Sequence, residues 1–87
     1  MEGSIPQNAY KAHPKTAHYE EMAKNLLKAE LKRKGVTYAQ LAEKLGDIGI
    51  SETERNLANK ISRGGFTAAF LFQCLEAIGC HSLRLRD

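Results

Sequence analysis

The chain has few prolines and no long apolar run, and both absences limit what kind of protein it can be. Its 87 residues include only two prolines, both close to the N-terminus, and this scarcity argues against disorder in the rest of the chain. No apolar run approaches the roughly 18 residues of a membrane span, and the N-terminus lacks the apolar segment of a signal peptide. We therefore expect a cytoplasmic protein that has no membrane partner.

Residue patterns typical of catalysis and metal binding are also missing. The C-x5-C-H spacing of Cys74, Cys80 and His81 matches no usual zinc site. No arrangement of Ser, His and carboxylate stands out, and no glycine-rich loop follows a strand. We expect a protein that is not an enzyme and holds no metal or cofactor. With no sign of export, the two cysteines are expected to be reduced thiols.

The remaining composition is that of one globular domain with a mild basic bias. Hydrophobic residues make up 43% and charged residues 26%, which is ordinary for a chain of this length. The formal net charge is +3 and the isoelectric point is near 9.0. This bias permits a nucleic-acid partner without requiring one.

The N-terminal part divides into an arm and a first helix. Residues 1–15 hold both prolines and show no helical periodicity, so we expect a flexible arm. Lys11 and Lys15 leave open a basic arm that wraps DNA, with a disordered tail as the alternative. A helix is predicted from about Thr16 to the residue before Gly35. Its apolar stripe consists of Tyr19, Met22, Ala23, Leu26, Leu27 and Leu31.

Two more helices are predicted from their N-terminal capping residues. Thr37 and Gln40 form a T-x-x-Q capping box, which begins a short helix of roughly nine residues that ends at Gly46. Thr67 caps a helix over residues 67–78 that is apolar nearly all round. Such a helix must be buried on more than one side. It is either part of a subunit interface or a central helix covered by the other three.

Between these two helices lies the stretch with the clearest functional pattern. Ser51 and Glu54 predict a capping box and a helix over residues 52–63, with a narrow apolar side facing the core. The opposite side carries Arg55, Asn56, Asn59 and Arg63, with Lys60 on its flank. Arg and Asn are the side chains that read guanine and adenine edges, and a helix fits the major groove. The same composition also suits an ordinary solvated helix.

The C-terminal tail, residues 81–87, alternates apolar and polar side chains. This strand pattern has no partner within an all-helical fold, so it would pair with the same segment of a second copy. A loose tail is the alternative. We expect a homodimer whose interface comprises Phe70, Phe72, Leu75, Ile78, Leu83 and Leu85.

Part of the chain resembles the DNA-binding domain of phage-repressor-type, or lambda repressor-like, helix-turn-helix regulators. The resemblance rests on TYAQLAEKLG at 37–46, NLANKISRG at 56–64 and A-I-G at 77–79. It implies close helix approach at Ala42 and a turn made by Gly46. A second and closer likeness, over nearly all of residues 26–85, is to small bacterial proteins known only as a domain of unknown function.

The chain departs from the repressor pattern in two places. About six extra residues precede the inward positions of the third helix, so DIGIS forms a real loop. Tyr38 stands where the family often has a glutamine that holds a phosphate. The expected fold is a compact all-α bundle of four helices over residues 16–80, containing a helix-turn-helix with a lengthened turn.

The expected function is sequence-specific binding of double-stranded DNA by a bacterial transcriptional regulator. Arg55, Asn56 and Asn59 are the candidates for base edges, and Tyr38, Lys60 and Arg63 for phosphates. The carboxylates of Glu52 and Glu54 would repel the phosphate backbone of DNA. Useful specificity would call for a dimer on two half-sites. The alternative is a protein-interaction module, of the antitoxin or adaptor type, that works through the apolar helix 67–78.

Overall fold

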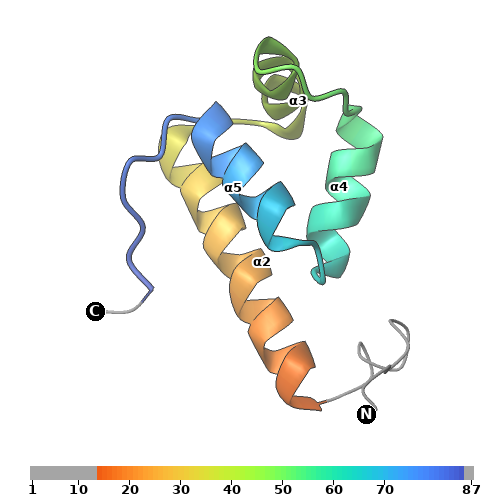
Figure 1. Cartoon of the computed structure of the whole chain (residues 1–87), viewed down its shortest axis with the longest axis vertical. Coiled ribbons are helices and arrows are strands. Elements are labelled where there is room, and N and C mark those ends of the chain that lie inside the picture. Colours follow the sequence, from red (N-terminus) through yellow and green to blue (C-terminus); the bar gives the residue numbers. More distant parts are fainter. Residues whose placement is uncertain (1–13, 86–87) are drawn as a thin grey trace.

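The computed structural model describes residues 14–85, which form four helices and no strand. In chain order the helices are α2 (Pro14–Lys34), α3 (Tyr38–Asp47), α4 (Glu54–Arg63) and α5 (Ala68–Ala77) (Figure 1). The predicted all-α bundle is therefore confirmed. Residues 81–85 form no strand in this single chain. Residues 1–13, which make up most of the expected arm, and residues 86–87 lie outside the described part.

The first helix begins two residues earlier than its sequence pattern suggested. Pro14 opens α2, and Thr16, the expected cap, lies inside the helix. A proline is well tolerated at the first helical position, because its missing N–H would have no partner there and its φ is already helical. The helix ends at Lys34, immediately before Gly35, as predicted.

The bundle is held together by one small apolar core. The long helix α2 and the short helix α3 each pack against both α4 and α5, with α3 lying across one end (Figure 1). No charged or polar side chain is buried among the described residues. The buried side chains are Leu27, Leu31, Leu41, Leu45, Leu57, Ile61, Phe70, Cys74, Leu75 and Ile78.

Two of the predicted helix starts are confirmed by their capping bonds. The Thr37 hydroxyl accepts from the Gln40 backbone N–H at 3.1 Å, and the Gln40 side chain accepts from the Thr37 N–H at 2.9 Å. The Thr67 hydroxyl accepts from the Phe70 N–H at 3.0 Å. These bonds satisfy N–H groups that have no partner within the first turn of a helix.

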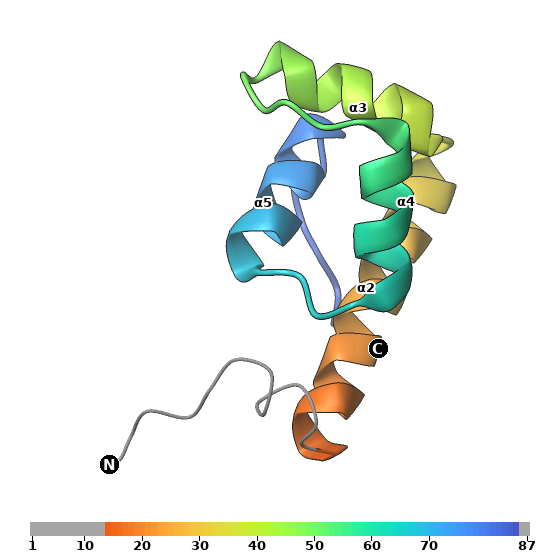
Figure 2. The same ribbon diagram turned by 90° about the vertical axis from the view of Figure 1, so that its right-hand side faces the viewer.

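The expected start of α4 is wrong by two residues. Thr53 caps this helix by accepting from the Asn56 N–H at 3.1 Å, and the helix begins at Glu54. Ser51 is exposed in the segment 48–53. This segment runs back along α3 before α4 begins (Figure 2). The chain therefore turns into α4 only where it has returned to the beginning of α3, and Thr53 is the hydroxyl at that point.

The turn after α3 is made by Gly49 and not by Gly46, which corrects the expectation taken from the repressor resemblance. Gly46 lies inside α3, where a Cβ would meet no atom within 4 Å. Gly49 has a φ of +84°. The Ile50 N–H donates to the Leu45 carbonyl at 2.9 Å, closing a glycine-dependent helix end. The positive φ of Gly49 and this hydrogen bond together form the lengthened turn.

Candidate nucleic-acid interface

Helix α4 presents one polar side to solvent. Leu57 and Ile61 are buried in the core and fix the rotation of the helix. Arg55, Asn59 and Arg63 follow one another at intervals of four residues on the opposite, exposed side. Side chains at this spacing lie one above another on a helix, so the three form a continuous line.

The side chains on this line are not engaged elsewhere in the protein. Arg55, Asn59 and Arg63 make no side-chain hydrogen bond or ion pair with any described residue. Asn56 is also exposed, and only its backbone N–H is used, by the Thr53 cap. The donors and acceptors of the line are therefore available to a partner molecule.

Lys60 does not belong to this free surface, although the sequence placed it among the phosphate contacts. Its ammonium donates to the Glu52 carboxylate at 2.7 Å and lies 4.8 Å from the centre of the Phe70 ring. The Glu52 side chain is only 11% exposed. Lys60, itself in α4, therefore links the turn 48–53 to α5. Its ion pair also neutralises Glu52, one of the two carboxylates that would repel DNA phosphates.

Glu54, the other carboxylate, sits away from the line. Successive helical residues are about 100° apart, so Glu54 points well to the side of Arg55. It lines a shallow hollow of about 400 Å³ together with Tyr38, which is half-buried. Lys28 and Lys32 of α2 line the same hollow.

These two lysines were missed by the sequence reasoning. Both are exposed, and neither pairs with a carboxylate among the described residues. They lie four residues apart on the polar side of α2, and this spacing alone could have indicated that the two ammonium groups are neighbours on the surface. What the sequence does not show is that the polar side of α2 meets the beginning of α4 here.

Only part of the surface predicted to join two copies is exposed. Phe70, Leu75 and Ile78 are buried in the core of the single chain. Phe72 and Leu85 are each 66% exposed, and Leu83 is half-buried. A hollow of about 530 Å³ lies between α5 and the residues that follow it, with Phe72, Leu75 and Leu83 in its lining. We call Phe72 and Leu83, which both line this hollow, the apolar patch; Leu85 lies outside the lining.

The helix α4 and the C-terminal tail lie on opposite sides of the molecule. In Figure 1 the helix α4 and the C-terminal tail flank the pair formed by α2 and α5. In Figure 2, turned by 90°, α4 faces the viewer and the tail passes behind. A partner bound at one surface would not cover the other.

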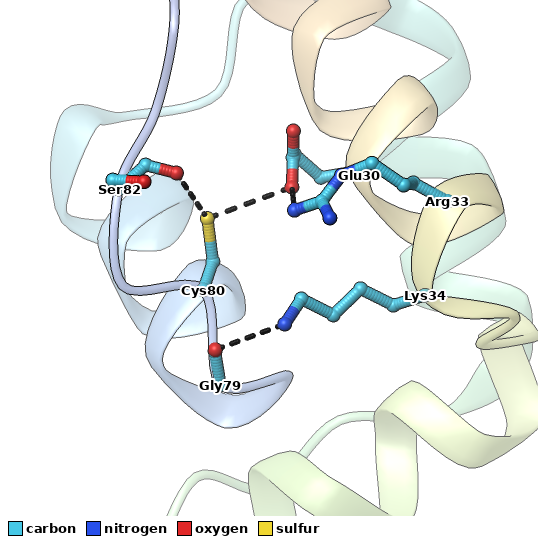
Figure 3. Close-up of polar contacts among 6 residues, drawn as sticks. All are labelled: Glu30, Arg33, Lys34, Gly79, Cys80 and Ser82. Atoms are coloured by element: carbon cyan, nitrogen blue, oxygen red, sulfur yellow. Dashed lines mark hydrogen bonds and ion pairs between the residues drawn. The ribbon is translucent and has the colours of Figure 1, made fainter.

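Polar contacts hold the turn after α5 against the end of α2 (Figure 3). Lys34 donates to the Gly79 carbonyl at 3.0 Å, and the Cys80 thiol lies 3.6 Å from the Glu30 carboxylate. Within the tail, the Cys80 thiol also lies 3.2 Å from the Ser82 carbonyl. Arg33 bonds Glu30 at 2.6 Å, and this hydrogen bond lowers the pKa of the Glu30 carboxyl. These contacts position the start of the tail and leave α4 untouched.

The features that would point to other kinds of site were also located. Both thiols are free, with Cys74 inside the core and Cys80 half-buried. Within residues 14–85 no group of three or more His, Cys, Asp or Glu side chains could hold a metal ion. None of the helices in this part of the chain is long and apolar enough to cross a membrane.

Comparison with known proteins gave one finding. The family described as "Domain of unknown function (DUF6471)" matches residues 19–83, which cover all four helices except the first five residues of α2. Curated proteins and solved structures gave no match.

Proposed function

The chain belongs to the DUF6471 family, and we propose that it is a sequence-specific DNA-binding protein that places α4 in the major groove. It would act as a bacterial transcriptional regulator of the helix-turn-helix kind. One observation carries the proposal: Arg55, Asn59 and Arg63 form an exposed line on α4 whose polar groups have no partner within the described chain.

The chemistry of this line suits a duplex. Arg and Asn side chains each present paired hydrogen-bonding groups that match guanine and adenine edges in the major groove. The Lys60 contact with Glu52 removes a negative charge that would otherwise repel phosphates. The side of α4 that would enter the groove is therefore cationic and free of carboxylates.

Phosphate contacts would come from the residues beside the beginning of α4. Lys28, Lys32 and Tyr38 line one hollow together with Glu54, the first residue of α4. The two ammonium groups outnumber the single carboxylate, so the lining carries a net positive charge. Phosphate contacts fix the register of a protein on DNA, while base contacts supply the specificity. This hollow would hold the backbone next to the groove that α4 enters.

Salt-dependent binding tests the proposal. Affinity for a mixed-sequence duplex is measured by fluorescence anisotropy at several salt concentrations for the parent, Arg55→Ala and Arg63→Ala. We expect the parent's affinity to fall steeply with salt, because phosphate contacts release counterions. A substitution that removes one phosphate contact reduces the slope by about 1, and we expect this for Arg63→Ala.

Two further variants serve as controls. Arg33→Ala removes the same charge from a residue that is paired with Glu30, on the side of the molecule that faces Cys80, and should leave the slope unchanged. The double variant Glu52→Gln, Lys60→Met should lower the melting temperature with little change in slope, because it removes both charges of one ion pair. A parent protein that fails to bind duplex DNA even at low salt would refute the proposal.

A protein-interaction module, of the antitoxin or adaptor type, is the second candidate. The observation that favours it is the exposure of Phe72 at 66%, beside the hollow between α5 and the tail. The salt titration separates the two candidates, because a protein module would show no salt-dependent affinity for duplex DNA.

A further inference from the structure

We infer that α4 selects a guanine and an adenine no more than two base pairs apart, with Arg55 reading the guanine and Asn59 the adenine. The inference rests on the proposed function and specifies its target. Two observations support it. Both side chains lie on one exposed line of α4, and the neighbouring polar side chains are either bound to another residue, as Lys60 is to Glu52, or point in a different direction.

The spacing of the two side chains sets the spacing of the bases. Four residues of α-helix rise by about 6 Å, and a base-pair step of B-DNA rises by about 3.4 Å. A helix lying along the groove would therefore bring Arg55 and Asn59 to bases about two steps apart. A helix tilted into the groove brings residues three or four apart to successive bases, as zinc-finger helices do.

The chemistry of the side chains sets the identity of the bases. An arginine can donate two hydrogen bonds to guanine O6 and N7, and an asparagine can bond both N6 and N7 of adenine. Both side chains are exposed and have no other partner among the described residues, so no existing bond must be broken.

The neighbouring polar residues are excluded on geometric grounds. Asn56 lies about 100° around the helix from Arg55 and about 60° from Asn59, at the edge of the line on the side of Lys60. Lys60 is held by Glu52 and Phe70. Arg63 is the last residue of α4, about 12 Å along the helix from Arg55, and recognition helices contact bases through their N-terminal residues, so Arg63 is assigned to a phosphate.

Selection from a pool of randomised duplexes tests the inference with the full chain. The enriched sequences should share a guanine and an adenine within two base pairs. Affinities are then measured for the enriched duplex and for duplexes in which each of these base pairs is replaced. Each replacement should weaken binding of the parent roughly 5- to 150-fold, the range for a good bidentate contact.

The variants assign each base to its reader. Arg55→Ala should abolish the preference at the guanine alone, and Asn59→Ala the preference at the adenine alone. Asn25→Ala is the matched control and should retain both preferences, since it removes an exposed asparagine of α2, outside the line.

The remaining outcomes separate failure of this inference from failure of the proposed function. Specific binding to a consensus whose preferences survive both substitutions would overturn the inference and leave sequence-specific DNA binding in place. Absence of DNA binding at low salt would overturn both.

Discussion

Cys74 shows how strongly the core of this small protein acts on a single titratable group. Its side chain is 0% exposed, and burial raises the pKa of the thiol from about 9.0 to about 12. The folded state therefore keeps the thiol protonated at pH values where the unfolded chain ionises it. The resulting stabilisation is complete below pH 9 and is lost progressively as the pH rises toward 12.

We expect urea unfolding to reveal this loss between pH 8 and about pH 11. The comparison is with Cys74→Ala, which should be less stable at pH 8 because it leaves space in the core. Between pH 8 and about pH 11, the free energy of unfolding of Cys74→Ala should fall less than that of the parent. Equal slopes for the two proteins would show that Cys74 contributes nothing to the alkaline instability.

The candidate site illustrates which residue properties a sequence can reveal. The outward positions of Arg55, Asn59 and Arg63 follow from the 3.6-residue period once Leu57 and Ile61 are assigned to the core. The role of Lys60 could not be predicted in this way. It depends on Glu52, eight residues earlier, and on Phe70 in another helix, and a helical pattern carries no information about such contacts.

At the scale of secondary-structure elements, the turn between α3 and α4 distinguishes this chain from the compact helix-turn-helix. Gly49 has a positive φ, so Gly49→Ala should cost about 1–2 kcal/mol of stability. Gly46 lies in helical conformation with open space at its Cβ position, so Gly46→Ala should stabilise the protein by about 0.5–1 kcal/mol. Urea denaturation of the two variants measures this difference.

The two glycine variants form a matched pair, since the same methyl group is added three residues apart. A compact turn would reverse the result, with the cost falling on Gly46. The structure predicts the opposite order because the Schellman-type end of α3 is closed by the Ile50 N–H on the Leu45 carbonyl.

The boundaries of the elements could be predicted wherever local chemistry decides them. The Thr37 and Thr67 caps act on backbone groups within three residues, and both were identified correctly. The start of α4 was missed because Ser51 and Thr53 are both suitable hydroxyls. The choice between them is made by the path of the turn, which must return along α3 to reach the beginning of that helix.

At the scale of the whole molecule, the opposite placement of α4 and the C-terminal tail changes what a homodimer would do. The sequence suggested two copies reading two half-sites of one duplex. Two copies joined through the apolar patch would instead place α4 on the outer side of each copy, because α4 and the C-terminal tail flank opposite sides of the pair formed by α2 and α5 (Figures 1 and 2). Each copy would then contact its own duplex.

We expect a second copy to dock on the apolar patch. Phe72 is part of the lining of the hollow, and in a two-fold dimer the Phe72 of the other copy would enter that hollow. Phe72→Glu should therefore convert a dimer into a monomer, as measured by size-exclusion chromatography with light scattering. Ala39→Glu adds the same charge to an exposed position of α3 outside the lining of the hollow and should remain dimeric.

The same variant tests the separation of the two surfaces. Affinity of Phe72→Glu for a short duplex that can hold only one copy should equal that of the parent, since α4 lies on the far side of the bundle. A parent that is already monomeric would refute docking of a second copy on the patch. A loss of affinity in a folded Phe72→Glu protein would show that dimerisation and DNA binding are coupled. The two surfaces would then not act independently, contrary to the placement of α4 and the tail on opposite sides of the bundle.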